Sequence, residues 1–204
     1  MRGRYGELIE RMGRFCYSAL MNLQAPQRMT VDEYLVWAEG RPGRFELIDG
    51  VVRQMSPETS GHADDKQAAL MALKTAIARA GLEAYAKPDG MTVRVSNHAC
   101  FEPDALVYMA PRIDRGAVEI PNPIIVVEIA SPSTRKYDSG FKLSGYMSLP
   151  SIHHILLIDG SERTLVHHRR VSATEFLAKT VVDGILNLDP PGLEIPVADF
   201  FAVD

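Results

Sequence analysis

The run Pro123-Ile-Ile-Val-Val-Glu-Ile-Ala130 is the most hydrophobic strand-like stretch of this sequence, and a single carboxylate interrupts it. A nearly continuous apolar run of this length predicts a strand that other elements cover on both faces. A helix-like segment from Ser131 to about Leu149 follows, and a second apolar run spans His153 to Ile158. A strand, a helix and a strand at this spacing predict a crossover unit with two parallel strands.

The sequence on the amino-terminal side of this unit predicts two helices and a hairpin. Thr30 and Glu33 have the spacing of a capping box, so we expect a helix over Val31–Glu39. The dipeptide Asp49-Gly50 divides two apolar runs between Arg44 and Met55, which is a strong signal for a β-hairpin. The segment His62–Ala80 lacks proline and is followed by Gly81, as expected of a helix with a glycine stop.

The remaining apolar runs are short and are typical of strands. Those before the crossover unit are Ala84–Ala86, Met91–Val95 and Phe101–Tyr108. After it, Thr164–Arg169 should pair with the preceding strand, and short strands near Val181 and Leu186 precede a helical turn over Val197–Phe201. The fold class is therefore α/β (α+β), with a mixed β-sheet flanked by helices.

Length and charge limit the organisation of the chain. Its 204 residues suit one domain over 29–204, preceded by an extension, 1–28, that we expect to be helical and loosely packed. No apolar run is long enough to span a membrane, and two cysteines are too few for a disulfide framework, so we expect a cytoplasmic protein. A net charge of −4 argues against coating nucleic acid by bulk charge, but a metal-dependent nuclease site is itself built from carboxylates.

Two acidic residues occupy positions where a carboxylate is costly. Glu128 interrupts the most hydrophobic strand, and Asp104, after Pro103, lies inside another apolar run. A buried carboxylate needs a charged partner or a bound cation. If the two strands are neighbours, both carboxylates lie at one end of the sheet, and with the backbone carbonyl of Ile129 they predict a site for Mg²⁺ or Mn²⁺.

The following segment offers a cation to this site. Asp138, Lys142 and Tyr146 recur at intervals of four and share one face of the predicted helix. Lys142 could therefore reach the metal site, with Lys136 as the second candidate.

Each of these residues also has a purely structural interpretation. Glu128 could be satisfied by an arginine or by backbone amides, and Asp104 could end a turn. Lys142 could form an exposed pair with Asp138, which also suits the first turns of a helix. Tyr146 could be a packing residue with a bonded hydroxyl, and Ser131–Thr134 could simply cap the helix.

In this order, these residues form a motif that resembles the PD-(D/E)XK nuclease superfamily, and within it the Uma-type family of restriction endonucleases, over roughly Met29 to Phe201. Ala130 stands where the motif lysine of the superfamily would be. The matching residues are Phe45-Glu-Leu-Ile-Asp-Gly50, Met55-Ser-Pro57, His62, Pro103-Asp104, Val127-Glu-Ile-Ala-Ser-Pro-Ser-Thr134, Asp138, Lys142 and Tyr146.

The resemblance implies a restriction-endonuclease-like fold, a Mg²⁺ site, a DNA substrate and a homodimer. It also implies that Lys142 takes the role of the motif lysine and that Glu46 joins the site. The predicted activity is metal-dependent endonucleolytic hydrolysis of DNA with Asp104, Glu128, Lys142 and Glu46 as catalytic residues. Two alternatives stay open: a catalytically silent nucleic-acid-binding or regulatory protein, and a metal-dependent enzyme for a small phosphorylated or non-nucleic substrate.

Two histidine pairs lie on the strands of a predicted hairpin. Pairing across the turn would place His154 opposite His168 or His167. Because no cysteine is near, we interpret this cluster as a solvated edge rather than a zinc site, with phosphate contact through Arg169-Arg170 as an alternative.

Overall fold

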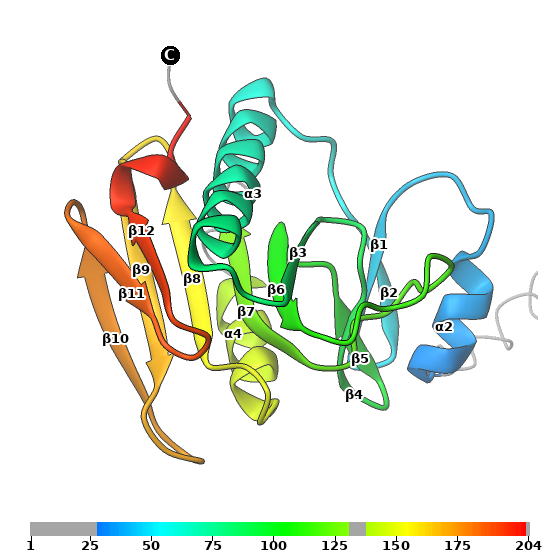
Figure 1. The fold of residues 1–204 in the computed structure, drawn as a ribbon. Helices are drawn as coiled ribbons and strands as arrows, with labels where there is room; N and C mark the ends of the chain where they lie inside the picture. Colours follow the sequence, from blue (N-terminus) through cyan, green and yellow to red (C-terminus); the bar gives the residue numbers. More distant parts are fainter. Residues whose placement is uncertain (1–27, 131–137, 203–204) are drawn as a thin grey trace, which may run out of the picture.

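The computed structural model describes residues 28–130 and 138–202. Within these residues the strands form a six-stranded sheet in the order β10-β9-β8-β7-β6-β3, a four-stranded sheet in the order β2-β1-β5-β4, and a two-stranded sheet of β11 and β12 (Figure 1). The strands are β1 (Phe45–Ile48), β2 (Val51–Gln54), β3 (Ala84–Pro88), β4 (Val93–Ser96), β5 (Ala99–Phe101), β6 (Ala105–Met109), β7 (Pro123–Ile129), β8 (His154–Asp159), β9 (Thr164–Arg170), β10 (Phe176–Val181), β11 (Ile185–Leu188) and β12 (Leu193–Pro196). The helices are α2 (Val31–Ala38), α3 (Ser60–Ala80), α4 (Asp138–Ser148) and the 3-10 helix η1 (Val197–Phe200).

The predicted crossover unit is present at the centre of the large sheet. Strand β7 pairs in parallel with β8, with Ile125 opposite His154 and Ile129 opposite Ile158. Helix α4 lies between these two strands in the sequence and ends at Ser148, close to the predicted end. The predicted helix start at Ser131, with its capping residues to Thr134, lies outside the described residues.

The six-stranded sheet is covered on both faces, as the apolar run at β7 predicts. One core packs α3 against alternate strand residues such as Val107 and Val127. The other core packs Tyr146 of α4 against the residues between them, such as Leu106 and Val126. Successive side chains of a strand point to opposite faces, so one continuous apolar strand serves both cores.

The local signals near the amino terminus are confirmed. Thr30 and Glu33 form the capping box of α2, and Gly81 ends α3 in the left-handed conformation. The β1–β2 hairpin turns at Asp49 and Gly50, whose φ angles of 49° and 77° suit this dipeptide.

The predicted strand Phe101–Tyr108 is wrong, because the structure divides it into β5 and β6. Strand β5 belongs to the four-stranded sheet, whereas β6 belongs to the six-stranded sheet. Pro103 lies at the point where the chain leaves one sheet for the other, and it has no N–H to continue a ladder. The break places Asp104 at the start of β6 instead of inside a strand.

The prediction of a solvated histidine edge is also wrong. Strand β10 covers β9, so β9 is an interior strand, and His154 is fully buried. The register places Arg169 opposite His154, so the two histidines meet diagonally, with His154 Nδ1 at 2.8 Å from His167 Nε2. His167 is also buried, and the Pro190 carbonyl, from the turn between β11 and β12, lies 3.0 Å from His154 Nε2, so neither histidine lies at a solvated edge.

In the part of the chain that the structure describes, no helix is long and apolar enough to cross a membrane.

Candidate active site

The two carboxylates singled out by the sequence lie side by side at one end of the six-stranded sheet. Strands β6 and β7 are antiparallel, with Ala105 opposite Val127, so Asp104 lies beside Glu128. The Ile129 N–H donates a 2.7 Å hydrogen bond to Asp104 Oδ2, which fixes one oxygen of this carboxylate. The predicted neighbourhood of the two acids is therefore confirmed.

Helix α4 brings a lysine and a tyrosine onto Glu128. Lys142 Nζ lies 3.4 Å from Glu128 Oε2, and the Tyr146 hydroxyl donates a 2.6 Å hydrogen bond to Glu128 Oε1. The Lys142 side chain is only 12% exposed, so the alternative of an exposed helix pair is wrong. Tyr146 is buried with a bonded hydroxyl, as its packing interpretation predicted.

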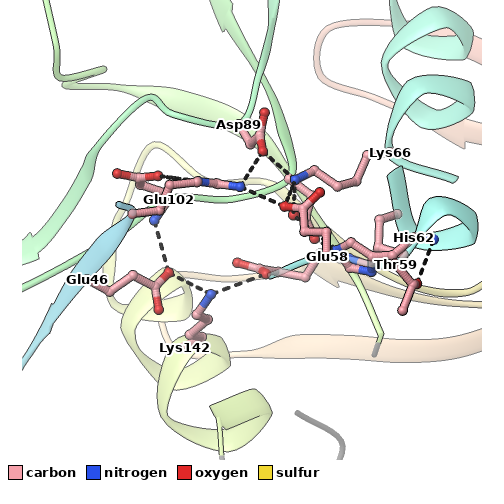
Figure 2. Close-up of polar contacts among 12 residues, drawn as sticks. Glu46, Glu58, Thr59, His62, Lys66, Asp89, Glu102 and Lys142 are labelled. Atoms are coloured by element: carbon pink, nitrogen blue, oxygen red, sulfur yellow. Dashed lines mark hydrogen bonds and ion pairs between the residues drawn. The ribbon is translucent and has the colours of Figure 1, made fainter. Parts of the chain in front are cut away.

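Glu46 of β1 joins the same cluster from the four-stranded sheet. Its Oε1 lies 2.7 Å from Lys142 Nζ and accepts a 3.2 Å hydrogen bond from the Glu102 N–H (Figure 2). Glu46 is buried, although it lies in a hairpin strand near a turn. Four sequence-predicted residues thus meet: Glu46 of β1, Glu128 of β7, Lys142 of α4 and Asp104, which directly precedes β6. Lys136 and the side chain of Asp138 lie outside the described residues.

Helix α3 adds two basic residues on the other side of Asp104. Lys66 Nζ lies 3.4 Å from Asp104 Oδ1, and His62 Nε2 lies 3.8 Å from the same oxygen. Within the described part of the chain, His62 Nδ1 is buried without a hydrogen-bond partner. From the sequence, His62 had no assigned role and Lys66 was missed, although their spacing of four on a predicted helix places them on one face.

Lys66 also belongs to a wider ion-pair network with Glu58 and Asp89, as Figure 2 shows. Lys66 contacts Glu58 and Asp89, and both carboxylates also contact Arg44, at 2.7 and 2.6 Å. Arg44 in turn pairs with Glu102 at 3.2 Å. The sequence did not indicate these partners because they come from separate loops that only the tertiary fold brings together.

The environment shifts the pKa of each central group. Burial, together with the charges of Asp104 and Glu46, raises the pKa of Glu128 to about 7 despite Lys142 and Tyr146. Burial alone would raise the pKa of Asp104, but His62, the Ile129 amide and Lys66 hold it below its ordinary value. Burial alone would lower the pKa of Lys142, but Glu128 and Glu46 raise it.

The donor set fits a hard divalent cation. The connected cluster holds six carboxylates, and its cations are Arg44, Lys66, Lys142 and, when protonated, His62; the carboxylates are Glu46, Glu58, Asp89, Glu102, Asp104 and Glu128. Among the described residues, no group of three His, Cys, Asp or Glu side chains converges as a preformed metal site. Mg²⁺ does not require one, since one or two carboxylates, other oxygen ligands and several waters are its usual shell.

Comparison with solved structures identifies the class of fold. The chain superimposes with a TM-score of 0.65 on a crystal structure titled as a "putative nuclease" of the DUF820 group from Anabaena variabilis, at 19% identity. The match covers 84% of this chain and 97% of that chain, and it shows that the mixed α+β fold is shared.

Sequence comparison gives the family. The profile of the Uma2 family, described as "putative restriction endonuclease", matches residues 31–198, and the chain belongs to this family. An uncharacterised protein from Synechocystis sp. is 24% identical over 176 residues, covering 83% of this chain and 90% of that protein.

Proposed function

We propose that this protein is a metal-dependent endonuclease that hydrolyses phosphodiester bonds in DNA. The observation that carries the proposal is the convergence of Asp104, Glu128, Lys142 and Glu46 at one end of the central sheet. Membership of the restriction-endonuclease family supports a nuclease function, and the metal and the DNA substrate are our inference.

Asp104, Glu128 and the backbone carbonyl of Ile129 are the proposed ligands of Mg²⁺ or Mn²⁺. The N–H and C=O of one residue in an extended strand point to the same flank, and the Ile129 N–H faces Asp104. A divalent cation bound there would lower the pKa of a coordinated water and offset charge on the phosphate.

Lys142 is the proposed catalytic cation. Its ammonium lies against Glu46 and Glu128, from which it can donate hydrogen bonds to a phosphate oxygen and orient the attacking water. Glu46 holds this ammonium in place, and Tyr146 fixes the orientation of the Glu128 carboxylate. On the other side, Lys66 and the Ile129 amide fix Asp104.

Replacing Lys142 tests this assignment, because the lysine should act in turnover and not in metal binding. We expect Lys142→Ala to lose cleavage of supercoiled plasmid in Mg²⁺ by roughly 100- to 1000-fold, the cost of removing one donor that stabilises developing charge. Calorimetric titration should show that this variant still binds Mn²⁺.

Lys74→Ala provides the matched control, because Lys74 is an exposed lysine on α3. The control should cleave at the wild-type rate. Undiminished cleavage by Lys142→Ala would contradict the role of Lys142, and metal-independent cleavage by the wild type would contradict the proposed function. Binding of DNA and Mn²⁺ without cleavage would favour the alternative of a catalytically silent binding protein.

A further inference from the structure

A cavity of about 360 Å³ lies beside the candidate active site, and the proposed reaction does not use it. Its walls come from the end of α2, the start of β1 and two later loops. Residues lining it include Ala38, Arg44, Phe45, Asp89, Gly90 and Glu102. Ligand pockets commonly measure about 300–1000 Å³, so this cavity has room for a small ligand.

Two routes connect the cavity to the candidate site. Glu102 lines the cavity, and its N–H donates a hydrogen bond to Glu46 Oε1. By the second route, Asp89 contacts Lys66, whose ammonium lies 3.4 Å from Asp104 Oδ1. The cavity wall is therefore one hydrogen bond from Glu46 and one lysine from Asp104.

The walls present hydrogen-bond donors beside acceptors. The guanidinium of Arg44 pairs with Glu102 at 3.2 Å and with Asp89 at 2.6 Å, and all three side chains keep part of their surface exposed. Phe45 also lines the cavity, and its ring packs edge-to-face with Trp37, with the ring centroids 5.1 Å apart. A Cβ placed on Gly90 would meet no heavy atom within 4 Å, so the backbone there is open to an occupant.

We propose that this cavity receives an unpaired nucleobase with an exocyclic amino group, belonging to the DNA strand that is cut. The inference rests on the proposed function, which places the phosphate of that strand at Asp104 and Glu128. Carboxylates of Glu102 and Asp89 accept from the amino group, and Arg44 donates to the adjacent ring nitrogen or carbonyl. Thymine fits poorly, because two carbonyl oxygens flank its single N–H and repel the carboxylates.

The proposal defines the state of the substrate. In a duplex, stacking and pairing hold each base inside the helix, where a cavity in the protein cannot enclose it. The substrate is therefore a single strand, or a duplex from which one base is extruded.

Filling the cavity tests the proposal in a binding assay that does not depend on catalysis. The four deoxynucleoside monophosphates are titrated by calorimetry into wild type, Ala38→Trp and the control Val36→Trp. Ala38 lines the cavity, whereas Val36 lies on the same helix and is 74% exposed. We expect dCMP, dAMP and dGMP to bind about tenfold more tightly than dTMP. Ala38→Trp should lose this binding, and Val36→Trp should keep it.

Glu102→Gln keeps the shape of the wall and removes its charge, so it decides the question if Ala38→Trp does not fold. This variant should discriminate clearly less between dTMP and the other three nucleotides, because Asp89 is then the one charged acceptor left among the two. Wild-type affinity for dCMP in a folded Ala38→Trp, equally tight binding of dTMP by the wild type, or unchanged discrimination in Glu102→Gln would each overturn the inference.

A cleavage assay separates this inference from the proposed function. The wild type could bind amino-bearing nucleotides selectively and yet cut no DNA. That result would support the nucleobase site and contradict the proposed nuclease activity. The wild type could instead cleave DNA, with Ala38→Trp and Glu102→Gln cutting single-stranded and duplex DNA in the same ratio as the wild type. That result would overturn the proposed role of the cavity and leave the nuclease function intact.

Discussion

At the scale of single residues, the buried pair His154 and His167 makes the stability of the fold depend on pH. His154 Nε2 lies 3.0 Å from the Pro190 carbonyl oxygen, and its Nδ1 contacts His167. Burial is the main cause that lowers the pKa of both histidines to about 4. In the unfolded chain they take up protons as the pH falls past about 6.5, so folding stability is lost between pH 6.5 and 4.

This linkage predicts how steeply the unfolding free energy falls as the pH is lowered. Each histidine that protonates only in the unfolded chain adds about 1.4 kcal/mol per pH unit to the fall in unfolding free energy. His167→Gln should reduce the slope of unfolding free energy against pH by about 1.4 kcal/mol per pH unit. Urea titrations between pH 6.5 and 4 measure this slope. The control His153→Gln, one residue from His154 in the chain, should keep more of the slope. An identical slope in wild type and His167→Gln would show that His167 is not responsible.

Carboxylates within apolar runs were the sequence feature that best predicted the candidate site. Glu128 was predictable because a carboxylate interrupts an apolar strand, and Asp104 because it lies in a second such run. Lys66 was not, since a lysine four residues after His62 is an ordinary feature of a helix surface. Its burial against Asp104 arises only when α3 packs across the sheet.

At the scale of elements, α4 positions Lys142 only if it packs closely on β4 and β5. A Cβ on Gly145 would lie 2.7 Å from Phe101 Cε2 and 3.1 Å from Val95 Cγ2. Gly145 therefore allows the helix to approach the four-stranded sheet.

Replacing this glycine should move the helix and with it the lysine. We expect Gly145→Ala to lower the unfolding free energy by about 1–3 kcal/mol, the usual cost of overpacking, and to reduce DNA cleavage. Gly140→Ala on the same helix meets no atom within 4 Å and should gain up to about 1 kcal/mol of helix propensity. Urea denaturation measures both, and equal stability of the two variants would contradict this packing role.

Elements with a strong local signal were predicted accurately, and the errors occurred where tertiary structure decides. The capping box of α2 and the Asp49-Gly50 turn were found because short-range geometry determines them. The change of sheet after Phe101 was missed, because an apolar run gives no indication that its two halves pair with different strands. The histidine cluster was wrongly predicted at a sheet edge for the same reason, since β10 pairs with β9 and makes it an interior strand.

At the scale of the whole molecule, the described fold begins at Arg28. Arg28 forms an ion pair with Asp49, and the Met29 N–H donates a 2.9 Å hydrogen bond to the Gly50 carbonyl. The family profile matches residues 31–198, which lie within this part of the chain.

We therefore propose that the domain predicted over 29–204 folds without the extension, apart from Arg28, whose ion pair with Asp49 joins it to the domain. Deleting residues 1–27 should change the melting temperature by less than about 2 °C, because the contacts of Arg28 and Met29 are kept. A calorimetric scan of both proteins measures this shift. A fall of more than about 5 °C would show that the extension stabilises the fold, contrary to the proposed domain boundary.

The central claim is that a divalent cation held by Asp104 and Glu128 hydrolyses DNA. The most direct test is cleavage of supercoiled plasmid and of single-stranded DNA in Mg²⁺, Mn²⁺ or EDTA by wild type and Asp104→Ala. We expect metal-dependent cleavage that falls roughly 100-fold or more in the variant, since even outer-shell partners of a metal are worth about 10- to 100-fold. Cleavage that persists in Asp104→Ala or in EDTA would contradict it.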